Sequence, residues 1–108
     1  MVKQGDIIKL NFDPQLGHEQ SGYRPALVVS KDIFNEKLKI AIACPITNAD
    51  KGNPLHVQLD SRTVTTGFVM CDQIKSLDLV ARPHTVTEKI PRDLLKKVFD
   101  IIVAEIEI

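Results

Sequence analysis

The stretch GHEQSGYRPALVVS, residues 17–30, joins a polar loop directly to an apolar strand. Its first half carries an acid, an amide and a hydroxyl between two glycines. Its second half contains the apolar run of residues 26–29, which is typical of a strand buried on both faces. Pro25 biases Arg24 toward extended backbone. Because loops held by a rigid strand often carry chemistry, this segment predicts a functional site at the start of a central strand.

The sequence on both sides of this segment reads as short strands separated by turns. Alternating or β-branched apolar residues predict strands over residues 6–12, 26–30, 38–44, 55–59, 67–71 and, past a kink, 74–80. Residues 13–22 and 45–54 carry loop and turn chemistry. Residues 31–37 predict a short helix with Ser30 as its cap. This spacing predicts a mainly β domain with some helix, built as a compact, strongly bent antiparallel sheet or small barrel.

Residues 91–107 predict a C-terminal helix. Pro91 fits its first turn, and apolar residues recur at helical spacing. They are Leu94, Leu95, Val98, Phe99, Ile102 and Ile106, with Ile101 and Val103 widening the stripe. The width allows two interpretations. The helix is deeply packed in the core, which is the favoured one, or it is partly buried against a second subunit.

Composition limits the possible functions. The 108 residues predict a single domain over 1–108, and 14 basic and 14 acidic side chains give a net charge of zero. A neutral chain is a poor general nucleic-acid coat, since such coats depend on many phosphate contacts. No apolar run is long enough to span a membrane and no signal peptide opens the chain, so we expect a cytoplasmic protein. Cys44 and Cys71 are expected to be free, buried thiols, and the cysteines and histidines show no metal-ligand spacing.

Four motifs together resemble the MazF/PemK family, the endoribonuclease toxins of bacterial toxin–antitoxin pairs. They are Gly5-Asp6-Ile7, residues 17–30, Cys44-Pro45-Ile46-Thr47 and the run CDQIKSLD at residues 71–78. They occur in the family's order and cover nearly the whole chain. The resemblance implies an SH3-like barrel with a C-terminal helix, a homodimer, no cofactor, single-stranded mRNA as the substrate, and neutralisation by a cognate antitoxin.

RNA cleavage without a metal needs a base for the 2′-hydroxyl, a group that stabilises the crowded phosphorane, and an acid for the leaving oxygen. Arg24 suits the second role because its planar fork binds two phosphate oxygens. Its structural alternative is an ion pair with Glu19 or Asp13 that orders the loop. Thr47 can donate to a phosphate oxygen, or can merely make a turn hydrogen bond. The family resemblance implies that Arg24 and Thr47 share the catalytic pocket.

The sequence leaves two carboxylates, Glu19 and Asp72, as candidates for the general base. The resemblance gives Glu19 a catalytic role in some members and a base-recognition role in others. In the PemK branch the residue matching Asp72 is the base, working with an arginine two positions earlier. Met70 occupies that earlier position here, so this sequence favours the version built on Arg24 and Thr47.

Five further polar side chains are predicted RNA contacts: Gln20, His56, Asp72, Gln73 and Lys75. Glutamine can pair with a base edge, lysine can meet a phosphate and histidine can stack on an unpaired base. The alternative for His56, Gln73 and Lys75 is an ordinary solvated strand position. An aromatic content of 5% argues against a long stacking platform, so we expect a short recognition sequence.

Two rival functions stay in view. A small barrel could be a non-catalytic binding module, and a gyrase-directed toxin can occupy the same fold. The sequence favours the endoribonuclease because Arg24 and Thr47 both occur in their motif context, which a binding module would have no need to keep.

Overall fold

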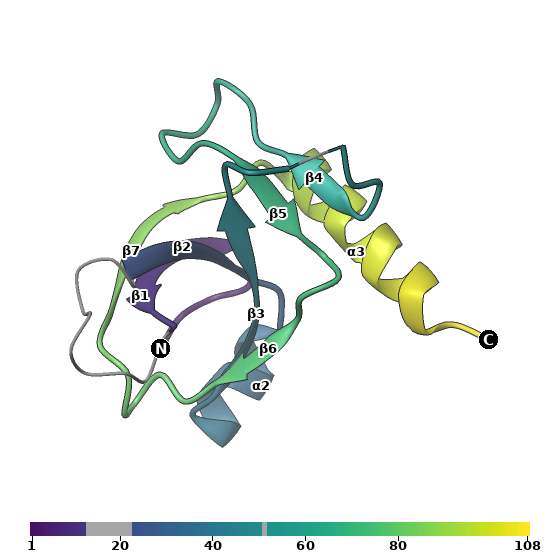
Figure 1. Cartoon of the computed structure of the whole chain (residues 1–108). Coiled ribbons are helices and arrows are strands. Elements are labelled where there is room, and N and C mark those ends of the chain that lie inside the picture. The colour runs from purple at the N-terminus through teal and green to yellow at the C-terminus, as the bar shows by residue number, and fades with distance from the viewer. Residues whose placement is uncertain (13–22, 51) are drawn as a thin grey trace.

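The computed structural model describes residues 1–12, 23–50 and 52–108, and these residues form seven strands and two helices (Figure 1). The strands are β1 (Asp6–Asn11), β2 (Tyr23–Val28), β3 (Ala41–Thr47), β4 (His56–Gln58), β5 (Phe68–Met70), β6 (Lys75–Leu77) and β7 (His84–Lys89). The helices are α2 (Asp32–Leu38) and α3 (Arg92–Ile106). The strands join in the order β4-β5-β3-β2-β1-β7, with β6 also paired to β3, and every pair is antiparallel.

Strand β3 is the centre of the sheet. Its first residues pair with β6, as in Ala41 opposite Leu77, and its last two pair with β5, as in Ile46 opposite Val69. Its other edge pairs with β2. Figure 1 shows β3 extending from the α2 and β6 end of the molecule to the β4 and β5 end. The bent antiparallel sheet expected from the sequence is therefore confirmed, with β3 linking its two parts.

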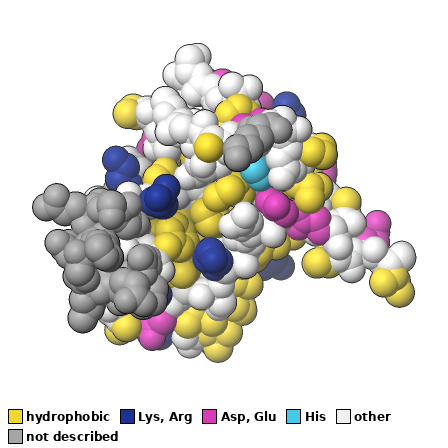
Figure 2. Space-filling model, in the orientation of Figure 1, with side chains coloured by type: hydrophobic (Ala, Val, Ile, Leu, Met, Phe, Trp, Pro, Cys, Tyr) yellow, Lys and Arg dark blue, Asp and Glu magenta, His cyan; other side chains and the backbone are white. Residues whose placement is uncertain are grey.

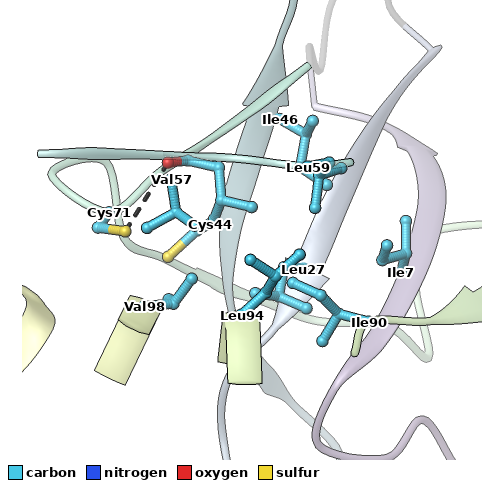
Figure 3. Packing of buried hydrophobic residues seen from close by; sticks show 11 residues of the cluster. Ile7, Leu27, Cys44, Ile46, Val57, Leu59, Cys71, Ile90, Leu94 and Val98 are labelled. Carbon is cyan, nitrogen blue, oxygen red and sulfur yellow. Dashed lines mark hydrogen bonds between the residues drawn. The ribbon is translucent and has the colours of Figure 1, made fainter. Parts of the chain in front are cut away.

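The core consists of two clusters on opposite faces of the strands, as the alternation of side chains requires. On β2, for example, Leu27 belongs to the first cluster while Ala26 and Val28 belong to the second. The first cluster also takes Leu94 and Val98 from α3 (Figure 3). Burying each large aliphatic side chain contributes about 1.5–3 kcal/mol to stability. Helix α3 is thus held to the sheet mainly by the buried side chains of Leu94 and Val98.

The favoured interpretation of α3 as a deeply packed helix is wrong. Only Leu94 and Val98 are buried, whereas Val103 is 51% exposed and Ile106 is 73% exposed. The helix lies along one side of the sheet beside β4 (Figure 1), so only one side of it meets the core. Leu95, Ile101 and Ile102 pack partly against the core. Val103 and Ile106 are uncovered in the single chain, which favours the second interpretation, burial against another subunit.

Three strands have limits that differ by three residues from those predicted. Strand β6 ends at Leu77 rather than at residue 80, and in the other two a proline is involved. Strand β2 begins at Tyr23 and ends at Val28, so it includes Pro25, which lies opposite Lys9. Strand β3 runs on to Thr47 through Pro45, which lies opposite Ala26. The fixed φ of proline is compatible with extended backbone, so neither proline ends its strand. Arg24 and Thr47 consequently lie on strands rather than in loops.

Strand β7 was not predicted from the sequence. Its residues, HTVTEK, are mostly exposed, and it pairs only with β1 at the edge of the sheet. An edge strand with both faces open carries little apolar alternation. The predicted cap of the first helix is also wrong: the cap position is Lys31, while the Ser30 hydroxyl accepts a hydrogen bond from the Ile42 N–H at 2.9 Å and contacts the buried Asn35 side chain.

Candidate active site

Arg24 and Thr47 lie on neighbouring strands, at the same end and on the same face of the sheet. The last pair between β2 and β3 is Ala26 opposite Pro45, and Arg24 and Thr47 each lie two residues farther toward that end. Side chains two residues apart on a strand share a face. The Arg24 side chain therefore lies on the same face as Ala26, and the Thr47 side chain on the same face as Pro45. Ala26 and Pro45 are paired, so this is one face, and both side chains lie beyond the second core cluster.

The Thr47 hydroxyl has a fixed acceptor role, and no acceptor in the described part of the chain takes its own proton. Thr47 pairs with Phe68 in the sheet, and its Oγ1 accepts a hydrogen bond from the Ala49 N–H at 3.1 Å. A hydroxyl that accepts in this way can still donate its own proton. The half-buried Thr47 thus makes the turn contact that the sequence offered as its structural alternative, and this contact leaves a donor available.

The Arg24 guanidinium is exposed, and no acceptor within residues 1–12, 23–50 and 52–108 forms an ion pair or hydrogen bond with it. The backbone of Arg24 pairs opposite Leu10 of β1. Glu19 and Gln20, and also Asp13, lie outside the described residues. The described part of the chain therefore presents Arg24 as a cation with all five N–H donors available.

Lys75 shares this face. It begins β6 opposite Ala43, and Leu77 on the same side of β6 belongs to the second core cluster. In Figure 2, Lys and Arg side chains border an apolar centre on the face turned to the viewer. We call Arg24, Thr47 and Lys75 the open edge. Gln73 lies just before β6 and is also exposed, in a turn closed by its N–H to the Met70 carbonyl at 3.1 Å.

His56 lies between two carboxylates, one of which the sequence did not single out. Its Nδ1 is 2.8 Å from Asp50 Oδ1, and its Nε2 is 3.2 Å from Asp72 Oδ1. The His56 side chain is only 6% exposed, so it is not a solvated strand position. Asp50 also accepts the Gly52 N–H, a short-range turn pattern that could have marked it as ordered. The three residues border a cavity of about 630 Å³ together with Gln73.

The negative charge of Asp72 influences Glu105, near the end of α3. Burial, and then the neighbouring charge of Asp72, raise the pKa of the Glu105 carboxyl. In Figure 2 acidic side chains gather beside the visible histidine, on the α3 side of the face. The site therefore has two electrostatically different parts: a cationic open edge, and a His–carboxylate cluster next to it.

Cys44 and Cys71 are free and fully buried, as the sequence predicted (Figure 3). Burial raises the pKa of both thiols to about 12, which keeps them protonated and unreactive at neutral pH. Across the described residues, no group of three His, Cys, Asp or Glu side chains is placed to hold a metal ion. Neither of the described helices is long and apolar enough to cross a membrane.

Comparison with known proteins identifies the family. The model of the PemK-like, MazF-like toxins of type II toxin–antitoxin systems matches residues 3–104. The endoribonuclease PemK of Escherichia coli is 34% identical over 90% of this chain and 76% of its own. The endoribonuclease toxin MazF of E. coli strain K12 is 40% identical over 75% of this chain and 72% of its own.

A solved structure agrees with these relatives. The crystal structure of MazF from Deinococcus radiodurans superposes with a TM-score of 0.87, at 36% identity, over 99% of this chain and 97% of that one. A MazE–MazF complex from the same organism gives a TM-score of 0.85 at 30% identity, over 99% of this chain and 96% of that one. With the bent sheet and the C-terminal helix in place, the chain belongs to the PemK-like, MazF-like family of toxins of type II toxin–antitoxin systems.

Proposed function

We propose that this protein is a toxin that cleaves single-stranded RNA, chiefly mRNA, at a short recognition sequence and so inhibits translation and growth. One observation carries the proposal: Arg24 and Thr47 share a face and an end of the sheet, and both have donors to spare. The endoribonuclease relatives support the same reaction class.

The proposed reaction uses the substrate's own 2′-hydroxyl as the nucleophile. Its oxygen attacks the adjacent phosphorus, the bond from phosphorus to the 5′-oxygen breaks, and the departing oxygen takes up a proton from solvent water. The products are a 2′,3′-cyclic phosphate and a 5′-hydroxyl end. Arg24 binds two non-bridging oxygens as their charge grows, and Thr47 donates to one of them. Each such preorganised donor contributes ~10²–10³ in rate.

The base that accepts the 2′-hydroxyl proton is Glu19 or Asp72. Asp72 lies 3.2 Å from the His56 ring, and a contact of this kind keeps a carboxylate oriented. Glu19→Gln and Asp72→Asn separate the two. The variant that lacks the base should lose the limb of the pH–rate profile in which the rate rises with pH. The variant that keeps the base should instead change which RNA sequence is cleaved.

The proposal is tested by incubating purified protein with a long RNA and mapping both new ends. In this mechanism Arg24 and Thr47 stabilise the phosphorane without a metal ion, so the cut should persist in EDTA, and the internal attack should leave cyclic phosphate ends. An RNA with one 2′-deoxy nucleotide at the cut position should resist cleavage. Cutting of the deoxy RNA, or loss of all activity with chelator, contradicts the mechanism. Intact RNA together with inhibited gyrase would favour the gyrase-directed alternative.

The toxin is proposed to act as a homodimer. Val103 and Ile106 on α3 are exposed apolar residues. A single domain of this size has a small core and marginal stability, so burying these residues in a dimer would stabilise it. Two-fold pairing is the commonest way for small proteins to bury such a surface. Sedimentation at micromolar concentration should give the dimer mass, and a monomer at all concentrations would contradict this. Ile106→Asp should shift the equilibrium toward monomer.

The natural inhibitor is proposed to be a cognate antitoxin with a flexible, acidic segment that competes with RNA. Carboxylates on such a segment can occupy the positions of phosphates at the open edge, and the segment gains affinity by folding as it binds. The complex of MazE with MazF from D. radiodurans supports a protein partner for this family. Binding of RNA and antitoxin without mutual weakening would contradict a shared site.

A further inference from the structure

The backbone just before β5 presses directly on the end of β3. Gly67 has φ +119°, and a Cβ atom there would lie 2.5 Å from the Thr47 carbonyl oxygen and 3.0 Å from its carbonyl carbon. The next residue, Phe68, pairs with Thr47 in the sheet. Only glycine has both this backbone geometry and this clearance. The position of the Thr47 main chain is therefore set against Gly67.

Gly67 ends a segment that is tied to the rest of the protein at several points. We call residues 59–67 the β4–β5 loop. The carboxylate of Glu88, on β7, accepts hydrogen bonds from the Val64 N–H at 3.0 Å, the Thr65 N–H at 2.8 Å and the Thr65 hydroxyl at 2.7 Å. The Leu59 N–H donates to the Gly67 carbonyl at 2.9 Å. The loop is thus fixed to the edge strand on one side and closed on itself at its base.

The loop also reaches the residue after Thr47. The Thr66 hydroxyl donates to Asn48 Oδ1 at 3.1 Å, and Asn48 lies between Thr47 and Ala49, whose N–H orients the Thr47 hydroxyl. Glu88, Thr65, Thr66 and the end of β3 therefore form a continuous series of contacts. None of the hydrogen bonds in this series involves Arg24.

We propose that Gly67 and Glu88 are positioning residues, through which the β4–β5 loop holds the Thr47 hydroxyl in its productive direction. The proposal rests on the proposed catalytic role of Thr47. A donor displaced by about an ångström can lose on the order of a hundredfold in rate. An alanine at position 67 forces the Thr47 carbonyl or the loop to move, because the Cβ would approach the oxygen too closely.

The experiment measures single-turnover RNA cleavage by Gly67→Ala, with Gly52→Ala as the matched control. Gly52 also has a positive φ, +70°, but a Cβ there meets no atom within 4 Å. Gly67→Ala should lower the rate constant about a hundredfold with KM little changed, while Gly52→Ala stays near wild type. Circular dichroism and melting establish that both variants fold. Equal activity of the two variants overturns the proposal.

A double-mutant cycle distinguishes positioning of Thr47 from general damage. If Gly67 acts through Thr47, the Gly67→Ala effect should disappear in a Thr47→Ala background and persist in an Arg24→Ala background. Persistence in both backgrounds overturns the proposal. Glu88→Gln, which fills the same space with fewer acceptors, should lower the rate about tenfold and follow the same pattern, and it decides the matter if Gly67→Ala does not fold. Normal cleavage by Thr47→Ala would instead refute the proposed function itself.

Discussion

The open edge and the β4–β5 loop differ in how far their polar groups are already engaged. In the loop, Arg62 donates to Asp60 and Asp93 at distances from 2.8 to 3.3 Å. At the open edge, Arg24 contacts no acceptor within the described part of the chain. A satisfied cation orders its neighbours, whereas a cation with free donors is ready for a ligand. The comparison separates an arginine engaged within the fold from one that we propose binds phosphate.

The largest expected effect comes from replacing these two arginines in turn. Arg24→Ala should reduce kcat/KM for RNA cleavage by ~10²–10³, because a phosphate-binding donor is lost, and should leave the melting temperature unchanged. Arg62→Ala should keep cleavage within about tenfold of wild type, since Glu88 still holds the loop, and should lower the melting temperature by at most a few degrees. Cleavage kinetics and thermal melts on the same preparations measure both.

Three results would break the comparison: near-normal cleavage by folded Arg24→Ala, a large loss by Arg62→Ala, or a lower melting temperature for Arg24→Ala. Arg24→Lys sharpens it further. An ammonium keeps the charge but cannot make the two-pronged contact, so this variant should also be impaired.

The next effect concerns the hydroxyl of Thr47. Thr47→Val keeps the shape of the side chain but removes the donor, so cleavage should fall ~10²–10³. Thr47→Ser keeps the hydroxyl and should remain within about tenfold of wild type. The rates of the two variants, with melting temperatures as the control for folding, decide between a catalytic donor and a turn contact. If the hydroxyl served only the turn contact with Ala49, Thr47→Val would lower the melting temperature and leave the cleavage rate near wild type.

Sequence predicted the fold well where apolar alternation was strong and poorly where it was weak. Strands β1, β4 and β5 lie within one or two residues of their expected limits. Strand β7 is open on both faces and gave no alternation to detect. Pro25 and Pro45 obscured the true ends of β2 and β3, because proline usually marks a strand end but is tolerated where extended backbone suits its φ.

The candidate site divides in the same way. Arg24 and Thr47 were singled out from motifs, and the strand register then brings them to one end and one face. The contacts of His56 with Asp50 and Asp72 had no signal in the sequence, since loop closure rather than spacing brings them together. The apolar period of α3 indicated which residues share a face, but it could not indicate what covers that face.

Acid should reduce the stability contributed by the carboxylates at the β4–β5 loop, whereas the open edge has no carboxylate among its residues. Hydrogen bonds from Arg62 lower the pKa of Asp60 to about 2 and also lower the pKa of Asp93. Burial acts to raise the pKa of Glu88, but hydrogen bonds from Thr65 and Val64 lower it overall. Carboxyls with depressed pKa values contribute stability above their unfolded values, near 4, which is lost as pH falls toward 2.

Melting temperatures from pH 7 to pH 2 test whether stability falls with pH in this direction. The wild type should lose stability below about pH 4, and Asp60→Asn should show a shallower fall, because one of the titrating groups is gone. Arg24→Ala serves as the control and should follow the wild-type curve. Parallel curves for wild type and Asp60→Asn would mean that the Arg62 contacts do not contribute to stability.

The smallest expected effect is on the salt dependence of RNA binding. Because the chain is neutral overall, we expect attraction for RNA to come from a local cluster, with Arg24 and Lys75 of the open edge as its members. Binding by the inactive Thr47→Ala protein should therefore release only about two or three counterions. Lys75→Gln in that background should weaken binding a few-fold and reduce the slope of log K against log salt by about 0.7, one phosphate contact on a single strand.

Lys96→Gln is the matched control, since Lys96 lies on α3, outside the open edge, and pairs with Asp100 at 3.2 Å. Both changes remove one positive charge, so a long-range effect of net charge would alter the two slopes equally. A local cluster predicts a change for Lys75→Gln only, because charges beyond about 10 Å are screened at 0.1 M salt. Equal slopes for the two variants, or a wild-type slope near ten, would show that RNA is bound over a broad surface and that the open edge is not its principal cationic contact.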